Sequence, residues 1–199
     1  MAEFGLIVAQ GPSALRTRVP EILEDADNEL PDLARETFAE LYERWLDHER
    51  RLTDYDRRLR LIAHEDPLTQ RLLQVPGVGV ITATALVASA GDLGVFRNGR
   101  QFAAWLGLVL RHYASAGKRR TGRITKRGDA YVRTLLVHGA RAALRTAPRR
   151  KDALSRWALT LKERRGPNKA AVALAAKHAR IIWALLTRDV DYQPRPVSA

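Results

Sequence analysis

A heptad repeat of apolar residues is the feature that most constrains the fold of this 199-residue chain. Two series recur every seven residues between residues 38 and 62, and charged residues fill most of the positions between them. This spacing predicts a helix from about Asp32, directly after Pro31, to about His64. Its apolar stripe packs against another helix, either of this chain or of a second copy. The two series, together called the 38–62 seam, are Phe38, Trp45, Leu52 and Leu59, and Leu41, His48, Tyr55 and Ile62.

The rest of the chain is also predicted to be helical, because it has no alternating strand pattern of useful length. Residues 1–31 are expected to be irregular, since Pro12, Pro20 and Pro31 interrupt any long helix. The predicted organisation is all-α, with a coiled-coil-type arm at 32–66, a helical domain at 67–190 and a tail at 191–199. Within the domain, helices are expected at 81–90, 98–107, 129–146, 152–165 and from an Asn168 cap onward, and a loop is expected at 109–128.

A short turn, Pro76-Gly77-Val78-Gly79, separates two apolar segments. Flanked in this way, it resembles a helix-hairpin-helix, in which Gly77 and Gly79 let the backbone approach a DNA phosphate. The amides at the start of the next helix would then donate hydrogen bonds to that phosphate. The same residues are compatible with a structural turn between packed helices. We predict DNA-backbone binding here and keep the structural turn as the alternative.

Positive charge is concentrated in one part of the sequence. The formal charge of the chain is +12, and residues 111–150 hold twelve Lys or Arg against the single acid Asp129, a local charge of +11. Because such a concentration destabilises a compact fold by self-repulsion, a polyanionic partner explains it better than a solvated basic face. We predict that this partner is nucleic acid.

Composition excludes several other classes of site. The chain has no cysteine, which excludes disulfides and thiolate metal sites and is typical of a reducing cytoplasm. No apolar run suggests a membrane-spanning helix, so no membrane partner is expected. The acids on and beside the heptad helix are spaced as a solvated face, and His48 is interpreted as a register-setting polar residue. No metal ligands are therefore predicted in this chain.

Three segments, in this order, carry a resemblance to a known family: LLQVPGVGVITATALVASAGDLGVFRNGRQFAAWLGLV, GKRRTGRITKRGDAYVRTLLVHGARAAL and RRGPNKAAVALAAKHARIIWALL. They resemble the C-terminal half of transposases of the family named after insertion sequences 110, 116 and 1111. The likeness runs from about Glu3 to Tyr192. It implies a protein of the prokaryotic cytoplasm, associated with the nucleoid.

The resemblance implies a chemistry for one serine. Family members carry an N-terminal ribonuclease-H-like domain whose Asp-Glu-Asp-Asp set binds a divalent metal such as Mg²⁺. Their C-terminal domain carries a serine that attacks a DNA phosphate, and a bridge RNA guides recognition. The segment Ala114-Ser115-Ala116-Gly117-Lys118 matches the serine motif, so Ser115 is the implied nucleophile. The implied phosphate-contacting cations are Arg111, Lys118, Arg119, Arg120 and Arg123, with Lys126 and Arg127 on flanking phosphates.

The sequence departs from the family pattern in three ways. Ala116 stands where glycine is usual, and Leu110 stands where proline is common. The metal-binding domain is not in this sequence, so we expect the chain alone not to transpose DNA. The alternatives are a non-catalytic nucleic-acid-binding module, which co-assembles with an intact transposase through residues 38–62, and a structural helical protein that meets RNA incidentally. A homo-oligomer through the same seam is also expected.

Overall fold

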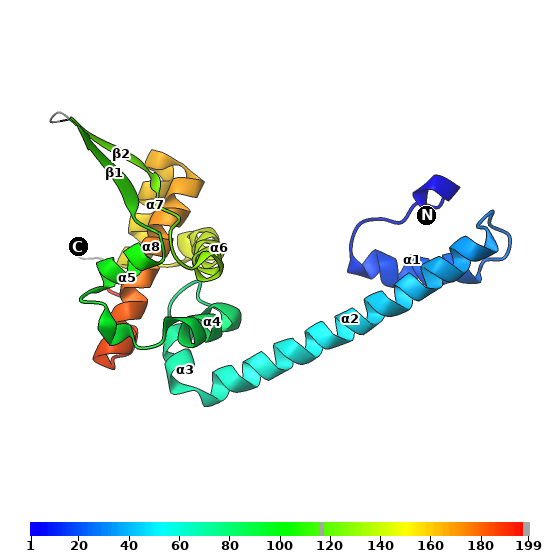
Figure 1. Ribbon diagram of the computed structural model, residues 1–199, viewed down its shortest axis with the longest axis horizontal. Coiled ribbons are helices and arrows are strands. Elements are labelled where there is room, and N and C mark those ends of the chain that lie inside the picture. The colour runs from blue at the N-terminus through cyan, green and yellow to red at the C-terminus, as the bar shows by residue number, and fades with distance from the viewer. Residues whose placement is uncertain (116–117, 197–199) are drawn as a thin grey trace. The chain divides into compact units, whose positions relative to one another are not determined.

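The helix expected from the heptad repeat is present as α2, Asp32–Glu65 (Figure 1). The computed structural model describes residues 1–115 and 118–196, and for residues 90, 112–115 and 118–121 it describes the backbone alone. The chain divides within α2 into two compact units, Met1–Arg58 and Leu59–Ala199. Most described residues are helical, so the all-α prediction is confirmed.

The prediction that residues 1–31 are irregular is wrong. A 3-10 helix, η1, covers Ala2–Phe4, and α1 covers Pro12–Glu24 with Pro20 inside it. Proline cannot donate to the carbonyl four residues earlier, that of Arg16. The Tyr42 hydroxyl donates to this carbonyl instead, at 3.3 Å, so a partner from α2 offsets the cost of the proline.

A side chain of α2 also caps the C-terminal end of α1. The guanidinium of Arg35 donates to the carbonyl oxygens of Ile22 at 3.1 Å and Leu23 at 2.7 Å. These are among the carbonyls that a helix leaves without a partner at its C-terminus. Val19 and Ile22 are the buried residues of α1, and they lie three residues apart on one face of the helix. Helix α1 therefore depends on tertiary contacts that local sequence rules do not include.

Part of the 38–62 seam has its partner within the chain. The Phe38 ring meets Phe4 edge to face at 6.4 Å between centroids, and the Arg16 guanidinium lies 5.8 Å from the centre of the Trp45 ring. Farther along α2, Leu52 and Tyr55 are 63% and 61% exposed. In the first half of the seam, Phe38 and Trp45 thus contact the N-terminal segment, and the second half presents apolar side chains to solvent.

In the second unit, helix α8, Pro167–Arg188, makes most of its contacts with α5, α6 and α7, and it also contacts α3 and η2. Phe102, Leu136 and Ile182 are at most 1% exposed and belong to one continuous core. The remaining elements are α3 (Pro67–Leu73), α4 (Val80–Ala90), α5 (Gly99–Trp105), α6 (Ala130–Thr146), α7 (Ala153–Arg165), and the 3-10 helices η2 (Leu93–Val95) and η3 (Ala147–Arg149).

Side-chain caps explain several of these helix starts. The side chain of Asn98 accepts hydrogen bonds from the amides of Arg100 and Gln101, as expected for an N-cap. Asp129 likewise accepts from the amides of Tyr131 and Val132 at the start of α6. The expected Asn168 cap is wrong, because α8 begins at Pro167 after Gly166. Proline at the first helical position needs no cap for its own missing N–H.

Helix α8 is also long and apolar enough to cross a membrane by length and composition. In this structure eight of its residues are buried in the core of the second unit. The apolar composition of α8 is therefore accounted for by helix packing.

The loop expected at 109–128 is wrong in part, because it contains a β-hairpin. Strand β1 covers Leu110–Ser115 and pairs antiparallel with β2, Lys118–Ile124. Figure 1 shows the hairpin extending from the helices of its unit. A strand that packs neither face on a core has no reason to alternate apolar and polar residues, so the sequence carried no strand pattern.

Candidate nucleic-acid interface

Two glycines bring the base of the hairpin against the end of α5. Gly107 has φ 71° and Gly128 has φ 88°, a conformation that strains residues with a side chain. A Cβ atom on Gly107 would overlap the backbone of Arg127, and one on Gly128 would overlap the carbonyl oxygen of Trp105. The Lys126 amide also donates to the Gly107 carbonyl at 3.1 Å. The two segments that flank the hairpin are thus held in direct backbone contact.

The half-buried guanidinium of Arg133, on α6, holds the same junction. Its Nη1 lies 3.2 Å from the carbonyl oxygen of Leu106 and 3.4 Å from those of Arg127 and Asp129. One cation therefore joins the end of α5, the segment after the hairpin and the start of α6. Arg133 is one of the twelve Lys or Arg of residues 111–150, and no local pattern in the sequence signals this contact.

Four predicted contact residues lie on the hairpin stem and the turn that follows it. Arg111, on β1, is exposed and donates from Nη2 to the carbonyl oxygen of Thr125 at 3.1 Å. Arg123, Lys126 and Arg127 are also exposed. Among the side chains that the structure describes, none of these four cations forms an ion pair. Their charge is available to an anionic ligand.

Ser115 is the last residue of β1. The register pairs it with Lys118, and the two residues before it with Arg119 and Arg120. The backbone therefore brings the implied nucleophile and three implied cations into one arm. The side chains of Ser115, Lys118, Arg119 and Arg120 lie outside the described residues, so their roles stay predictions.

In the turn at residues 76–79, one of the two glycines, Gly77, packs against a neighbouring helix. Gly77 has φ 85°, and its Cβ position would overlap the carbonyl oxygen of Gly139 on α6. This contact favours the structural turn that we kept as the alternative at Gly77. Gly79 precedes α4, is exposed, and has open space at its Cβ position. Contact of Gly79 with DNA stays a prediction.

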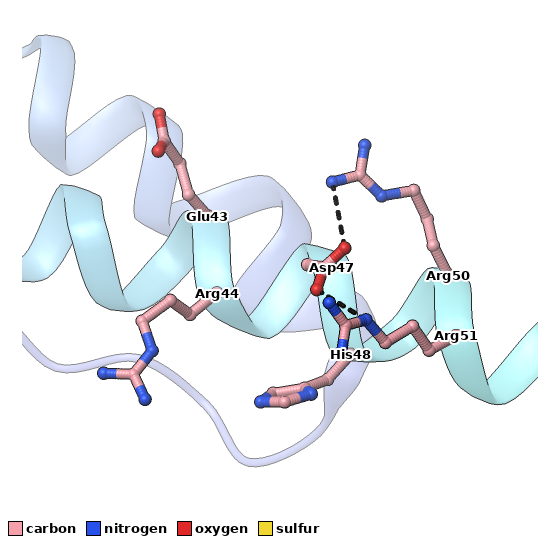
Figure 2. Close-up of a pocket in the computed structure, with 6 residues that line it drawn as sticks. All are labelled: Glu43, Arg44, Asp47, His48, Arg50 and Arg51. Atoms are coloured by element: carbon pink, nitrogen blue, oxygen red, sulfur yellow. Dashed lines mark ion pairs between the residues drawn. The ribbon is translucent and has the colours of Figure 1, made fainter.

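A shallow hollow on α2 is lined by charged residues, among them Glu43, Asp47 and His48 (Figure 2). The Asp47 carboxylate lies 2.8 Å from Arg51 Nε and 3.8 Å from Arg50 Nη2. Within the described part of the chain, no group of three or more His, Asp or Glu side chains is placed to hold a metal ion. The hollow is an exposed, internally paired helix surface.

The hairpin lies in a part of the chain that matches a known protein family. Residues 69–155, from α3 to the start of α7, match the family "Transposase IS116/IS110/IS902". The chain carries the transposase domain of this family. The transposase domain includes the hairpin, Gly107, Gly128 and Arg133, so the junction described above lies inside the matched region.

The similarity extends beyond the transposase domain to nearly the whole chain. The "Probable family 20 transposase" of Pseudomonas aeruginosa is 46% identical over 195 residues, which are 98% of this chain and 58% of the relative. The transposase for insertion sequence element IS1111A of Coxiella burnetii is 40% identical, over 97% of this chain and 53% of the relative. The transposase for IS1328 of Yersinia enterocolitica is 33% identical, over 96% and 57%. The chain thus spans about half the length of the curated relatives it matches.

Proposed function

We propose that this chain is the DNA-binding part of an insertion-sequence transposase and supplies Ser115 as the nucleophile of strand transfer. The observation that carries the proposal is the basic hairpin, whose stem exposes Arg111 and Arg123 and whose base is held against the helices. This hairpin lies within the matched transposase domain. By resemblance, DNA is the substrate, a bridge RNA is the guide, and the site of action is the prokaryotic nucleoid.

The proposed step is a transesterification. The Ser115 oxygen forms a bond to the phosphorus while the bond to one deoxyribose oxygen breaks, and the proton lost by the serine is balanced by the one gained by the departing hydroxyl. Fixed guanidinium groups stabilise the charge that develops on the phosphate oxygens. The described residues do not fit a divalent metal, so no step here is assigned to one.

A nicked donor-junction DNA tests the proposal. The chain, with the N-terminal domain of a relative supplied in trans, is expected to form a covalent protein–DNA adduct on a denaturing gel. Ser115→Ala removes the reacting oxygen, so the adduct should disappear while DNA affinity changes less than about threefold. An adduct that persists in Ser115→Ala would overturn the assignment of this serine. The isolated chain is expected to bind the DNA without forming the adduct.

Two outcomes of this assay favour the other candidates. Salt-dependent DNA binding with no adduct under any pairing supports the non-catalytic binding module. A structural helical protein would show little of the steep salt dependence expected for multi-phosphate contact, in which log affinity falls by about 0.9 per neutralised phosphate for each unit of log salt.

We also propose that the exposed half of the 38–62 seam joins two chains, either two copies or this chain and an intact transposase. Leu52 and Tyr55 present apolar surface at heptad positions, and Ile62, at the end of the seam, is 54% exposed. Pairing would bury this stripe as in other coiled coils, at about 25 cal/mol per Å² of apolar surface.

A charge on the seam is expected to abolish this self-association. Leu52→Asp should shift the chain to monomer in sedimentation velocity, with the midpoint of association raised more than tenfold, because a carboxylate at a core position is desolvated. Leu61→Asp is the matched control. Leu61 is 58% exposed on the same helix but lies off the heptad positions, so its substitution should leave the midpoint unchanged. Equal effects of the two substitutions would exclude the seam as the interface.

A further inference from the structure

One exposed face of α6 carries a row of polar and basic side chains with no acid. The residues recur at intervals of three and four, which places them on a single stripe of the helix. The opposite face is buried and includes Val132, Leu136 and Ala140. All members of the stripe, here called the α6 ridge, are exposed: Tyr131, Thr134, His138, Arg141 and Arg145.

The charges on the ridge are not compensated by neighbouring acids. Helix α6 contains no Asp or Glu, and among the described side chains neither Arg141 nor Arg145 forms an ion pair. The exposed surface of α2 is different, because Asp47 pairs with Arg51 at 2.8 Å and Asp54 with Arg57 at 3.0 Å. A solvated helix surface in this protein thus carries both signs. The ridge carries one.

Further cations lie next to the ridge. Arg141 Nη2 donates to Asn168 Oδ1 at 3.4 Å, which brings the start of α8 and the exposed Lys169 beside the ridge. The preceding end of α7 holds Lys162, Arg164 and Arg165 around the single acid Glu163. Positive charge therefore extends from α6 onto α7 and α8, and it matches a partner that is uniformly anionic.

The position of the ridge favours duplex DNA as that partner. Tyr131 lies two residues after the N-cap Asp129 and seven residues after Ile124, the last residue of β2, so the ridge begins a short distance along the chain from the base of the hairpin. From Tyr131 to Arg145 the helix rises about 21 Å, and a duplex advances about six base pairs over that length. The major groove of B-DNA admits an α-helix, whereas that of A-form RNA is too narrow and deep for side chains to enter.

We propose that the α6 ridge is a second DNA contact, which holds the duplex flanking the strand addressed by the hairpin. Arg141 and Arg145 each neutralise one phosphate, and Tyr131 and His138 donate to the backbone between them and the hairpin. This inference rests on the proposed function. It assigns to α6 a contact separate from the hairpin.

The test compares two charge-matched double substitutions in the full chain, on a duplex of about 20 base pairs. Arg141→Gln with Arg145→Gln should weaken binding about tenfold or more at 0.1 M salt and lower the slope of log affinity against log salt by about 1.8. Arg57→Gln with Arg60→Gln on α2 is the control and should change the slope by less than about 0.5. Thermal melting checks that both variants are folded, as expected for exposed positions.

Each further outcome bears on one proposal. Equal loss in ridge and control variants would overturn the ridge, since it would show a diffuse effect of net charge. The ridge would also be overturned if its variant bound DNA like the wild type while Arg123→Gln with Arg127→Gln weakened binding. That result would leave the proposed function standing. A ridge variant impaired only on double-stranded RNA would replace the proposed partner. A wild-type chain that binds no duplex would overturn the proposed function itself.

Discussion

Alanine in place of Gly128 is expected to lower the free energy of unfolding by about 4 kcal/mol, which lowers the melting temperature by roughly 10 °C. Two costs add. The backbone at φ 88° disfavours any side chain, and the new Cβ would overlap the Trp105 carbonyl oxygen. The Trp105 oxygen is a backbone atom and the Cβ position is fixed by the backbone of residue 128, so the overlap is not relieved without displacing the hairpin base. Thermal unfolding followed by circular dichroism measures the shift.

Two other glycines separate these costs. Gly166 also has a positive φ, 83°, but no atom of the described part of the chain lies within 4 Å of its Cβ position. Gly166→Ala should therefore show the conformational part alone, about 1 to 3 kcal/mol. Gly79→Ala, with open space and an ordinary φ of −99°, should change stability by less than about 0.5 kcal/mol. If Gly128→Ala melts no lower than Gly166→Ala, the close contact with Trp105 is not present in solution.

The second large effect is a loss of stability in mild acid caused by His178. This residue of α8 is 1% exposed, and neither of its ring nitrogens has a hydrogen-bond partner among the residues that the structure describes. Burial lowers its pKa from 6.5 to about 4. The unfolded chain therefore binds the proton first as pH falls. The resulting cost begins near pH 6.5 and is complete below about pH 4, where it reaches about 3 kcal/mol.

Urea denaturation at pH 7 and pH 4 tests this dependence. The free energy of unfolding should fall by about 3 kcal/mol less between pH 7 and pH 4 in His178→Leu than in the wild type, because leucine cannot take up a proton. The lining around His178 is otherwise apolar apart from Ser155, whose hydroxyl donates to Asp152 at 2.8 Å. Parallel curves for wild type and His178→Leu would show that this ring is not buried in the folded chain.

The stability that Asp152 contributes to the folded chain is lost in a different range of pH. Burial alone would raise the pKa of Asp152, but hydrogen bonds from Ser155 and from Arg150 outweigh burial and lower it from 3.8. A carboxyl with a lowered pKa contributes stability that is present above its unfolded value and is lost only as pH falls through its folded value. The stability contributed by Asp152 therefore persists at pH 4, where protonation of His178 in the unfolded chain has already lowered the free energy of unfolding.

How much of the structure was predictable depended on whether the decisive contact is local. The heptad spacing predicted α2, and Asn98 and Asp129 predicted where two helices begin, because a cap bonds amides two or three residues away. Pro20 was misinterpreted because its compensating partner, Tyr42, lies 22 positions later in the chain. The hairpin was missed because its strands extend from the helices of their unit (Figure 1), and such strands need no alternating apolar pattern to bury a face.

For the candidate site, the sequence by itself determined which residues are predicted to carry the chemistry, through the basic cluster and the resemblance around Ser115. Only the tertiary structure decided how they are held. Gly77 and Gly139, Gly107 and Arg127, and Gly128 and Trp105 meet as backbone against backbone. Such contacts depend on the separation of whole segments, which no single residue type encodes. The sequence records them only as glycines, and folding determines what each glycine approaches.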